Sequence, residues 1–460
     1  MSTPAFDTDV VILGAGSAGY ACALRAAHLG LSVTLIEADK LGGTCLHRGC
    51  IPTKAMLHAA EVADAVRSAP GVGVHATLDA IDIDGVNAFK AGVVSRLHRG
   101  LTGLIDQRGI RVIPGVGTLT DPHTVDVHGQ RVTARHVVLA TGARPGMAQG
   151  VEIAGHVITS DQALGMDWIP RTAVVLGGGV IGIEFASLWR SFGAEVAVVE
   201  AQDRLLPYED QDTSKAIARA LRRRGVTTKT STTISQVTED ATGVHVTASD
   251  GVTLDTDILL VAVGRVPNTE GLGLERLGVA LDRGYVIVDD RCHTGVPDVW
   301  AAGDIVPGPQ LAHRGFAQGI AIAERIAGMT VPPLVAERVP SVVYGDPEVA
   351  SVGLTEAQAV TAYGPDAIVV ESQGLGGNAR SLVLQTSGMV KIVRVKDGPV
   401  VGIHIVGARA GELIGEAQLI VNWEAFPEEV APLIHTHPTQ SEAMGEALLA
   451  LAGKPLHSHG

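Results

Sequence analysis

The chain opens on DVVILGAGSAGYACALRAAH, residues 9–28, followed by SVTLIE at residues 32–37. The order of residue types predicts a strand, a glycine-rich turn, a helix and a second strand that ends on Glu37. The glycines of the turn are Gly14, Gly16 and Gly19. In such a unit one glycine makes the tight turn, one lets the backbone approach a pyrophosphate and one packs helix on strand, while the terminal acid accepts hydrogen bonds from ribose hydroxyls. The opening segment therefore predicts a dinucleotide-binding fold.

The same arrangement recurs in TAVVLGGGVIGIEFASLWRSFGAEVAVVE, residues 172–200. Its glycines and terminal acid are Gly177, Gly179, Gly182 and Glu200. In both copies the acid lies 23 residues after the first glycine. An apolar stretch that ends in glycine follows each copy, at residues 137–142 and 258–264, and such a strand returns the chain to the same sheet. Two domain-level repeats, and hence two dinucleotides, are expected.

The pattern changes after the second repeat. Residues 294–304 predict a strand, then a turn at Gly303-Asp304 and a helix, as in a return to the first domain. Residues 391–396 and 400–406 flank Asp397-Gly398, which is a strong hairpin signal. We expect an α/β protein with two Rossmann-like dinucleotide-binding domains and a C-terminal α+β domain. The expected blocks are residues 1–148 and 269–336 for the first dinucleotide domain, 149–268 for the second and 337–460 for the C-terminal domain.

The composition excludes several classes of protein. Of the 460 residues 46% are apolar, yet no run approaches the roughly 18 apolar residues of a membrane span. The 35 basic and 49 acidic residues give a net charge of −14, which disfavours a nucleic-acid partner. Four cysteines are too few for a disulfide scaffold, and no secretory signal is visible before Gly14, so the cytoplasm is the expected compartment. We expect Cys22 and Cys292 in the core.

The other two cysteines lie in GGTCLHRGCIPTK, residues 42–54. On a regular helix, Cys45 and Cys50 would be separated by ~7.5 Å of rise and ~140° of rotation. A disulfide needs Cα atoms within roughly 7 Å, so the backbone must depart from an ideal helix, and Gly49 with Pro52 is compatible with that. Two buried free thiols and a zinc site are the alternatives, although a lone cysteine pair leaves too few zinc ligands. A redox-active disulfide is the favoured interpretation.

The whole chain resembles the pyridine nucleotide:disulfide oxidoreductases, and most closely their dihydrolipoyl dehydrogenase branch. The motifs that carry the resemblance are the two fingerprints, the cysteine segment, AVGRVPNT at 262–269, AAGD at 301–304, YGDPEVASVGLTE at 344–356 and HTHPTQSE at 435–442. The resemblance implies FAD at the first fingerprint and NAD at the second, with no metal. It implies the dimerisation domain at 337–460.

The resemblance also implies roles for individual residues. Cys45 would exchange with the substrate thiols and Cys50 would lie against the flavin. Lys54 would lie beside flavin N5 and pair with Glu184. Other implied cofactor-binding residues are Gly117, Thr141, Gly142, Gly264, Asp304 and Ala312. The departures from the pattern of relatives are His47, Thr53 and Gln318, and the resemblance implies that they change fine contacts around the flavin.

His437 and Glu442 lie in the segment HTHPTQSE, and a base held by a carboxylate is the arrangement that general acid–base chemistry needs. Taken alone, they are two polar residues before a helix, with capping chemistry at Ser441 and Glu442. The resemblance implies that they are catalytic and complete the site of the other subunit in a homodimer. His435 is expected to be structural. His457 and His459 near the end would make a poor metal site.

The resemblance implies oxidation of a protein-bound dihydrolipoyl group to lipoyl with reduction of NAD+ to NADH, as the E3 component of a multienzyme complex. The expected partners are lipoyl domains of a 2-oxoacid dehydrogenase acyltransferase or of the glycine cleavage H protein. Glutathione reductases usually carry arginines where Glu200 stands. Mercuric reductases and large thioredoxin reductases add a C-terminal cysteine pair that this chain lacks. A catalytically silent tethering subunit is the alternative from another class, and the intact cysteines and His437 oppose it.

Overall fold

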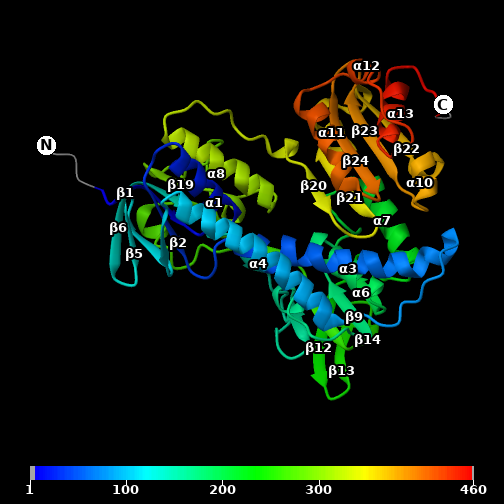
Figure 1. The fold of residues 1–460 in the computed structure, drawn as a ribbon, viewed down its shortest axis with the longest axis horizontal. Coiled ribbons are helices and arrows are strands. Elements are labelled where there is room, and N and C mark those ends of the chain that lie inside the picture. The colour runs from blue at the N-terminus through cyan, green and yellow to red at the C-terminus, as the bar shows by residue number, and fades with distance from the viewer. Residues whose placement is uncertain (1–5, 458–460) are drawn as a thin grey trace. The chain divides into compact units, whose positions relative to one another are not determined.

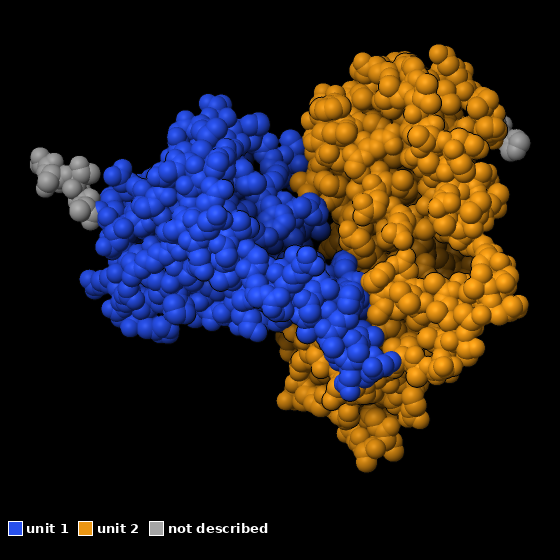
Figure 2. Space-filling view, in the orientation of Figure 1, with its two compact units in different colours: residues 1–56, 82–146, 264–336 blue, residues 57–81, 147–263, 337–460 orange. Residues whose placement is uncertain are grey.

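The computed structural model describes residues 6–457, so His459 lies outside the described residues. The chain divides into two compact units, shown in different colours in Figure 2. The first unit comprises residues 1–56, 82–146 and 264–336, and the second comprises residues 57–81, 147–263 and 337–460. Among the described residues, no helix is long and apolar enough to cross a bilayer.

The first unit is built on a parallel sheet of the order β3-β2-β1-β6-β19. Its strands are β1 (Thr8–Leu13), β2 (Val33–Glu37), β3 (Arg111–Pro114), β6 (Gln130–Leu139) and β19 (Val299–Ala301). The N-terminal half of β6 pairs antiparallel with β5 (Thr124–Val127), and β5 pairs antiparallel with β4 (Gly117–Asp121). A short antiparallel pair joins β7 (Ala143–Pro145) to β16 (Arg265–Pro267). Residues 10–13 of β1 are apolar and buried, which suits the central position of this strand in the sheet.

Two helices pack closely in this unit, α1 (Ser17–His28) and α8 (Ala312–Ile326), which lie side by side in Figure 1. The approach depends on Gly319, where a Cβ atom would lie 2.2 Å from the carbonyl oxygen of Ala18. The unit also contains α2 (Gly43–Arg48) and the whole of α4 (Ile83–Gln107). Of α3 (Cys50–Ser68) it contains only the first turns. Cys22 and Cys292 are buried in its core, as predicted.

The second unit contains a parallel sheet of equivalent order, β11-β10-β9-β15-β8. Its strands are β8 (Val157–Thr159), β9 (Thr172–Leu176), β10 (Glu195–Val199), β11 (Thr227–Lys229) and β15 (Ile258–Val261). The helices α6 (Val180–Ser191) and α7 (Gln211–Arg223) connect these strands. A three-stranded antiparallel sheet follows, with β12 (Ile234–Asp240), β13 (Gly243–Ala248) and β14 (Thr253–Thr256). The sequence repeat is therefore also a structural repeat.

The C-terminal part of the second unit is an antiparallel sheet of the order β20-β21-β24-β23-β22. Its strands are β20 (Ser341–Val343), β21 (Glu348–Gly353), β22 (Ile368–Gly374), β23 (Met389–Val395) and β24 (Val400–Gly407). Its helices are α9 (Glu356–Tyr363), α10 (Ala379–Val383), α11 (Ala410–Asn422), α12 (Pro427–Val430) and α13 (Glu442–Leu451). The predicted hairpin at Asp397-Gly398 is confirmed, with β23 and β24 paired on either side of it. The predicted fold class is confirmed.

Candidate functional site

The first fingerprint forms a cradle at the start of α1. Gly14 has a φ of +96°, and a Cβ atom there would lie 2.3 Å from the oxygen of Ala140. A Cβ atom on Gly19 would lie 1.8 Å from the oxygen of Gly14, so only glycine permits this packing of helix on strand. At Gly16 no atom comes closer than 4.0 Å to the Cβ position. The space in front of the helix N-terminus is therefore left open, which fits an approaching pyrophosphate.

Glu37 ends β2 beside this cradle. Its carboxylate accepts hydrogen bonds from the backbone N–H of Ala15 at 2.6 Å and of Asp39 at 2.8 Å. These bonds hold the carboxylate at the edge of the glycine turn, where a ribose would lie next to a pyrophosphate at the helix N-terminus. The residues present therefore fit a dinucleotide.

The second fingerprint repeats this geometry in the second unit. Gly177 has a φ of +111°, and a Cβ atom on Gly182 would lie 1.9 Å from its oxygen. Gly179 has no atom within 4 Å of its Cβ position. Glu200 is 8% exposed and accepts from the backbone N–H of Gly178 at 2.6 Å and of Gln202 at 2.7 Å. The two cradles therefore match in their glycines and in the bonding of their acids.

The cysteine pair lies where α2 ends and α3 begins. The helix breaks at Gly49, with φ −148° and ψ −112°, so the predicted departure from an ideal helix is confirmed. Neither cysteine forms a disulfide in the structure, and the Cys45 thiol is hydrogen-bonded to the Cys50 side chain. This bond and burial raise the pKa of Cys45, whereas the charge of Lys54 and a hydrogen bond with Ser17 lower it. The two sulfur atoms are thus adjacent and within the influence of a cation.

Sequence reasoning missed two neighbours of this pair, Ser17 and Tyr20. Both lie in the first turn of α1, three residues apart and hence on one face of the helix. Burial raises the pKa of Tyr20 to about 12, and the charges of Cys45 and Cys50 add to that effect. Its ring packs against Phe316 with centroids 5.4 Å apart. The sequence signal that could have found them is the hydroxyl of Ser17 and the phenol of Tyr20 in a helix that is otherwise rich in small residues.

Asp304 lies in a short 3-10 turn after β19, Gly303–Ile305. Burial raises its pKa, while Arg265 and Arg314 oppose that rise. Arg314 is 6% exposed and was not predicted to belong to the site. Ala312 is the first residue of α8 and lies between Asp304 and Arg314 in the sequence. A half-buried acid under the influence of two arginines is suited to hold polar groups of a cofactor.

The remaining predicted residues of the first unit have local roles as well. Thr141 donates its hydroxyl to the oxygen of Asn268 at 2.7 Å. Gly142 and Gly264 have φ values of +71° and +116°, which favour glycine. Gly117 begins β4, and a Cβ atom there would lie 3.0 Å from a side-chain carbon of Val125. The geometry therefore accounts for these residue types by folding alone, and their cofactor roles stay predictions.

The three departures from relatives each have a partner. His47 Nε2 lies 2.9 Å from the oxygen of Leu41, and its ring meets that of His98 at 5.0 Å. Thr53 donates its hydroxyl to the oxygen of Gly49 at 2.7 Å. Gln318 is buried, and its amide oxygen accepts a hydrogen bond from the backbone N–H of Gly303 at 2.9 Å. Gly303 is the residue before Asp304.

His437 and Glu442 are brought together in the second unit. His437 Nδ1 and Glu442 Oε1 lie 2.8 Å apart, and the backbone N–H of Thr439 donates to Glu442 Oε2 at 2.7 Å. Desolvation raises the pKa of Glu442, but Thr439 and His437 outweigh it and hold this pKa below its usual range. The His437 side chain is 74% exposed, so it is open to a reacting group.

Two further polar residues of the second unit are held within it. His435 Nε2 lies 2.8 Å from Glu416 Oε1, which agrees with the predicted structural role. Glu184 lies on α6, is 4% exposed and accepts from the backbone N–H of Tyr344 at 3.0 Å. Its predicted pairing with Lys54, which belongs to the first unit, stays a prediction. Among residues 6–457 no group of three or more His, Cys, Asp or Glu side chains is placed to hold a metal ion.

Known proteins match this chain over nearly its full length. Residues 8–319 match the pyridine nucleotide-disulphide oxidoreductases, and residues 339–448 match the dimerisation domain of the same proteins. The chain belongs to the pyridine nucleotide-disulphide oxidoreductase family. As a member of this family, the chain is a flavoprotein that uses FAD and NAD and has a dimerisation domain.

Among individual members of the family, a dihydrolipoyl dehydrogenase of Bacillus subtilis is 38% identical, over 98% of this chain and 100% of that protein. The mitochondrial dihydrolipoyl dehydrogenase of Pisum sativum is 37% identical, over 98% of this chain and 93% of that protein. The crystal structure of LpdA from Mycobacterium tuberculosis superposes with a TM-score of 0.89 at 31% identity, over 96% of this chain and 99% of that one. The resemblance predicted from the motifs is thereby confirmed.

Proposed function

We propose that the chain is a dihydrolipoyl dehydrogenase. In this reaction the two thiols of a dihydrolipoyl group are oxidised to the lipoyl disulfide, NAD+ takes up two electrons and one proton to become NADH, and one proton is released. The observation that carries the proposal is the hydrogen-bonded pair of Cys45 and Cys50 next to the start of the first fingerprint helix, in a chain that matches such enzymes over 98% of its length.

Within the cysteine pair, Cys45 exchanges with the substrate thiols and Cys50 takes the second position of the disulfide. Lys54, one helical turn after Cys50, favours the thiolate form of Cys45 by its positive charge. A bound flavin would supply the transfer of an electron pair between the cysteines and the nicotinamide. Gly14, Gly16 and Gly19 with Glu37 would hold it, and Asp304 would hold its polar chain.

The base for the substrate thiols is His437, oriented by Glu442. Its Nδ1 is occupied by the carboxylate, so Nε2 is the nitrogen that accepts a substrate proton. We propose that the C-terminal domain joins two chains into a homodimer in which His437 of each chain serves the cysteine pair of the other. The proposed domain blocks are 1–148 and 269–336 for FAD, 149–268 for NAD and 337–460 for the interface.

Glu200 accounts for a preference for NAD. A buried carboxylate at the end of β10 accepts hydrogen bonds from a ribose hydroxyl and repels a 2′-phosphate. The proposed partners are lipoyl domains of a 2-oxoacid dehydrogenase acyltransferase or of the glycine cleavage H protein, because these carry the dihydrolipoyl group. We place the reaction in the cytoplasm, where a reduced pair of thiols is compatible with the reducing conditions.

The test is reduction of NAD+ by dihydrolipoamide, followed by absorbance, with the purified flavoprotein. Wild-type protein and a Cys22→Ala control should be active, because Cys22 is a core residue outside the motif. Cys45→Ser should be inactive while keeping its flavin. A wild-type protein that contains flavin but does not turn over dihydrolipoamide would contradict the proposal.

A further inference from the structure

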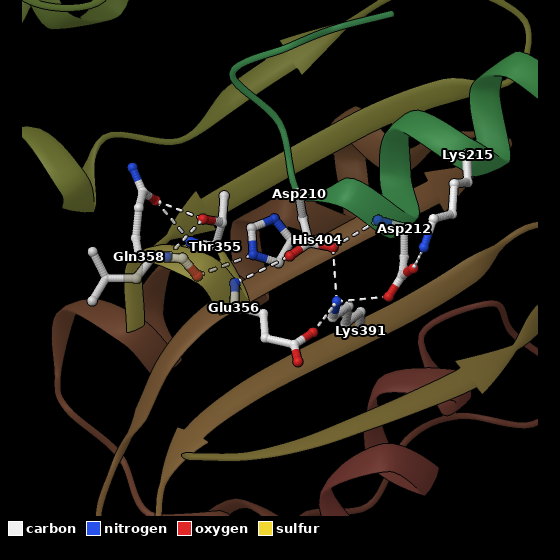
Figure 3. A network of polar contacts seen from close by, with 9 residues as sticks. Asp210, Asp212, Lys215, Thr355, Glu356, Gln358, Lys391 and His404 are labelled. Atoms are coloured by element: carbon white, nitrogen blue, oxygen red, sulfur yellow. Dashed lines mark hydrogen bonds and ion pairs between the residues drawn. The ribbon is translucent and has the colours of Figure 1, made fainter. Parts of the chain in front are cut away.

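The lysine Lys391 lies on β23 and is enclosed by three carboxylates, as Figure 3 shows. Its Nζ lies 2.8 Å from Asp210 Oδ1, 2.7 Å from Asp212 Oδ2 and 2.7 Å from Glu356 Oε2. The lysine and Asp210 side chains are each 2% exposed. Burial lowers the pKa of Lys391, but the three carboxylates outweigh it and raise this pKa overall. The ammonium group is therefore charged and fully engaged.

Asp210 links this ammonium group to α7, a helix of the parallel sheet that carries the second fingerprint. It is the residue before α7, and its Oδ1 accepts from the backbone N–H of Asp212 at 3.0 Å, which caps the helix. Its other oxygen accepts from the backbone N–H of Glu356 at 3.1 Å, at the start of α9. One buried carboxylate thus joins α7 to the C-terminal sheet and α9, and Lys391 neutralises it.

The loop of residues 201–209 runs from Glu200 to this junction. Leu205 and Leu206 are 1% and 2% exposed, and the backbone N–H of Leu206 donates to the oxygen of Gly178 at 2.8 Å. The Leu205 side chain covers Gly178 so closely that a Cβ atom there would lie 2.6 Å from it. The loop is therefore packed directly on Gly178, which lies between the first and second glycines of the fingerprint.

This loop is also strained and held from outside. Leu206 has a φ of +47°, a left-handed backbone that leucine rarely adopts unless its surroundings impose it. Glu209 accepts a hydrogen bond from Ser341 Oγ at 3.0 Å, which is a second tie to the C-terminal sheet. The ties through Glu209 and through Asp210 both lie at the C-terminal end of the loop.

We propose that Lys391 is a positioning residue for the nucleotide, acting through Asp210 and the loop 201–209 on Gly178 and Glu200. The residue touches no substrate itself. The inference rests on the proposed function, because it requires NAD to bind at the second fingerprint. It assigns to the C-terminal sheet a task beyond dimer formation, namely to hold the adenosine side of the nucleotide site in its binding geometry.

The test compares Lys391→Met with Lys215→Met in the holoenzyme. Lys215 is a matched control, because it also pairs with Asp212, at 3.1 Å, but its side chain is 56% exposed. NADH binding is measured by calorimetry, and flavin reduction by dihydrolipoamide is measured without nucleotide. We expect Lys391→Met to weaken NADH binding by about tenfold, in the range of couplings between separate sites, with unchanged flavin reduction. Lys215→Met should match the wild type in both measurements.

Two milder variants cover the case in which Lys391→Met does not fold. Asp210→Asn keeps the helix cap and removes the charge, and Glu356→Gln removes one partner of the ammonium group. Either should weaken NADH binding in the same direction by a smaller factor. Folded variants that bind NADH like the wild type, or that lose flavin reduction to the same degree as NADH binding, overturn the inference. A wild-type protein that binds no NADH would instead overturn the proposed function.

Discussion

Replacement of Gly179 by alanine should separate the two roles of a fingerprint glycine, folding and binding. Gly179 has extended backbone, φ −79° and ψ −172°, and no atom lies within 4 Å of its Cβ position. Alanine therefore fits without a clash. Loss of chain entropy in the unfolded state would stabilise the variant by about 0.4–1 kcal/mol. Alanine is also a poorer helix N-cap than glycine, which costs a similar amount, so the free energy of unfolding should stay within about 1 kcal/mol of wild type.

The added methyl group nevertheless occupies the open space at the start of α6. Crowding of one extra carbon in a close-packed contact costs about 1–3 kcal/mol. If that cost falls on the bound pyrophosphate, NADH binding weakens by roughly 5- to 150-fold. By contrast, Gly182→Ala puts a Cβ atom 1.9 Å from the oxygen of Gly177, so its cost falls on the fold itself.

The assay pairs urea denaturation with calorimetric NADH binding for wild type, Gly179→Ala and Gly182→Ala. Flavin content serves as the internal control, because the first fingerprint is unchanged in both variants. A Gly179→Ala protein with wild-type stability and wild-type NADH affinity would refute the interpretation of the open space as a pyrophosphate site. A loss of several kcal/mol in its stability would refute the packing argument.

Three further outcomes are expected. Cys50→Ser should lose the long-wavelength thiolate–flavin absorption on two-electron reduction, whereas Cys45→Ser should keep it; the opposite spectra would reverse the two roles. Mixing Cys45→Ser chains with His437→Gln chains after subunit dissociation should restore activity, because one site of the heterodimer is then intact; a mixture that stays inactive would place the histidine in its own chain's site. The hydrogen bond with Glu416 raises the pKa of His435 against desolvation, so its stabilising contribution is complete below about pH 6.5 and is lost as the pH rises through the raised pKa. Glu416→Gln should therefore lower the urea midpoint more at acidic than at alkaline pH, and an equal loss at both would contradict this pairing.

Two parts of the candidate site are formed by residues that are close together in the sequence. His437 and Glu442 are five residues apart and meet at 2.8 Å, because a turn and the start of α13 bring them together locally. The same holds for the cysteine pair, whose geometry depends on the break at Gly49. Such arrangements need only the short chain between the two residues, so a motif in the sequence can carry both residues of the pair, while their roles followed from the family resemblance.

The sequence by itself determined the two dinucleotide cradles, since a tight turn, a close helix and a terminal acid within 23 residues are set by backbone sterics at a few glycines. Only the tertiary structure showed that Ser17 and Tyr20 flank the cysteines and that Arg314 lies near Asp304. It alone joined Lys391 to Asp210, 181 positions away. Charged side chains on separate elements carry no periodic signal of their partners, because their pairing depends on how the sheets and helices pack, and that packing is fixed by apolar burial across the whole unit.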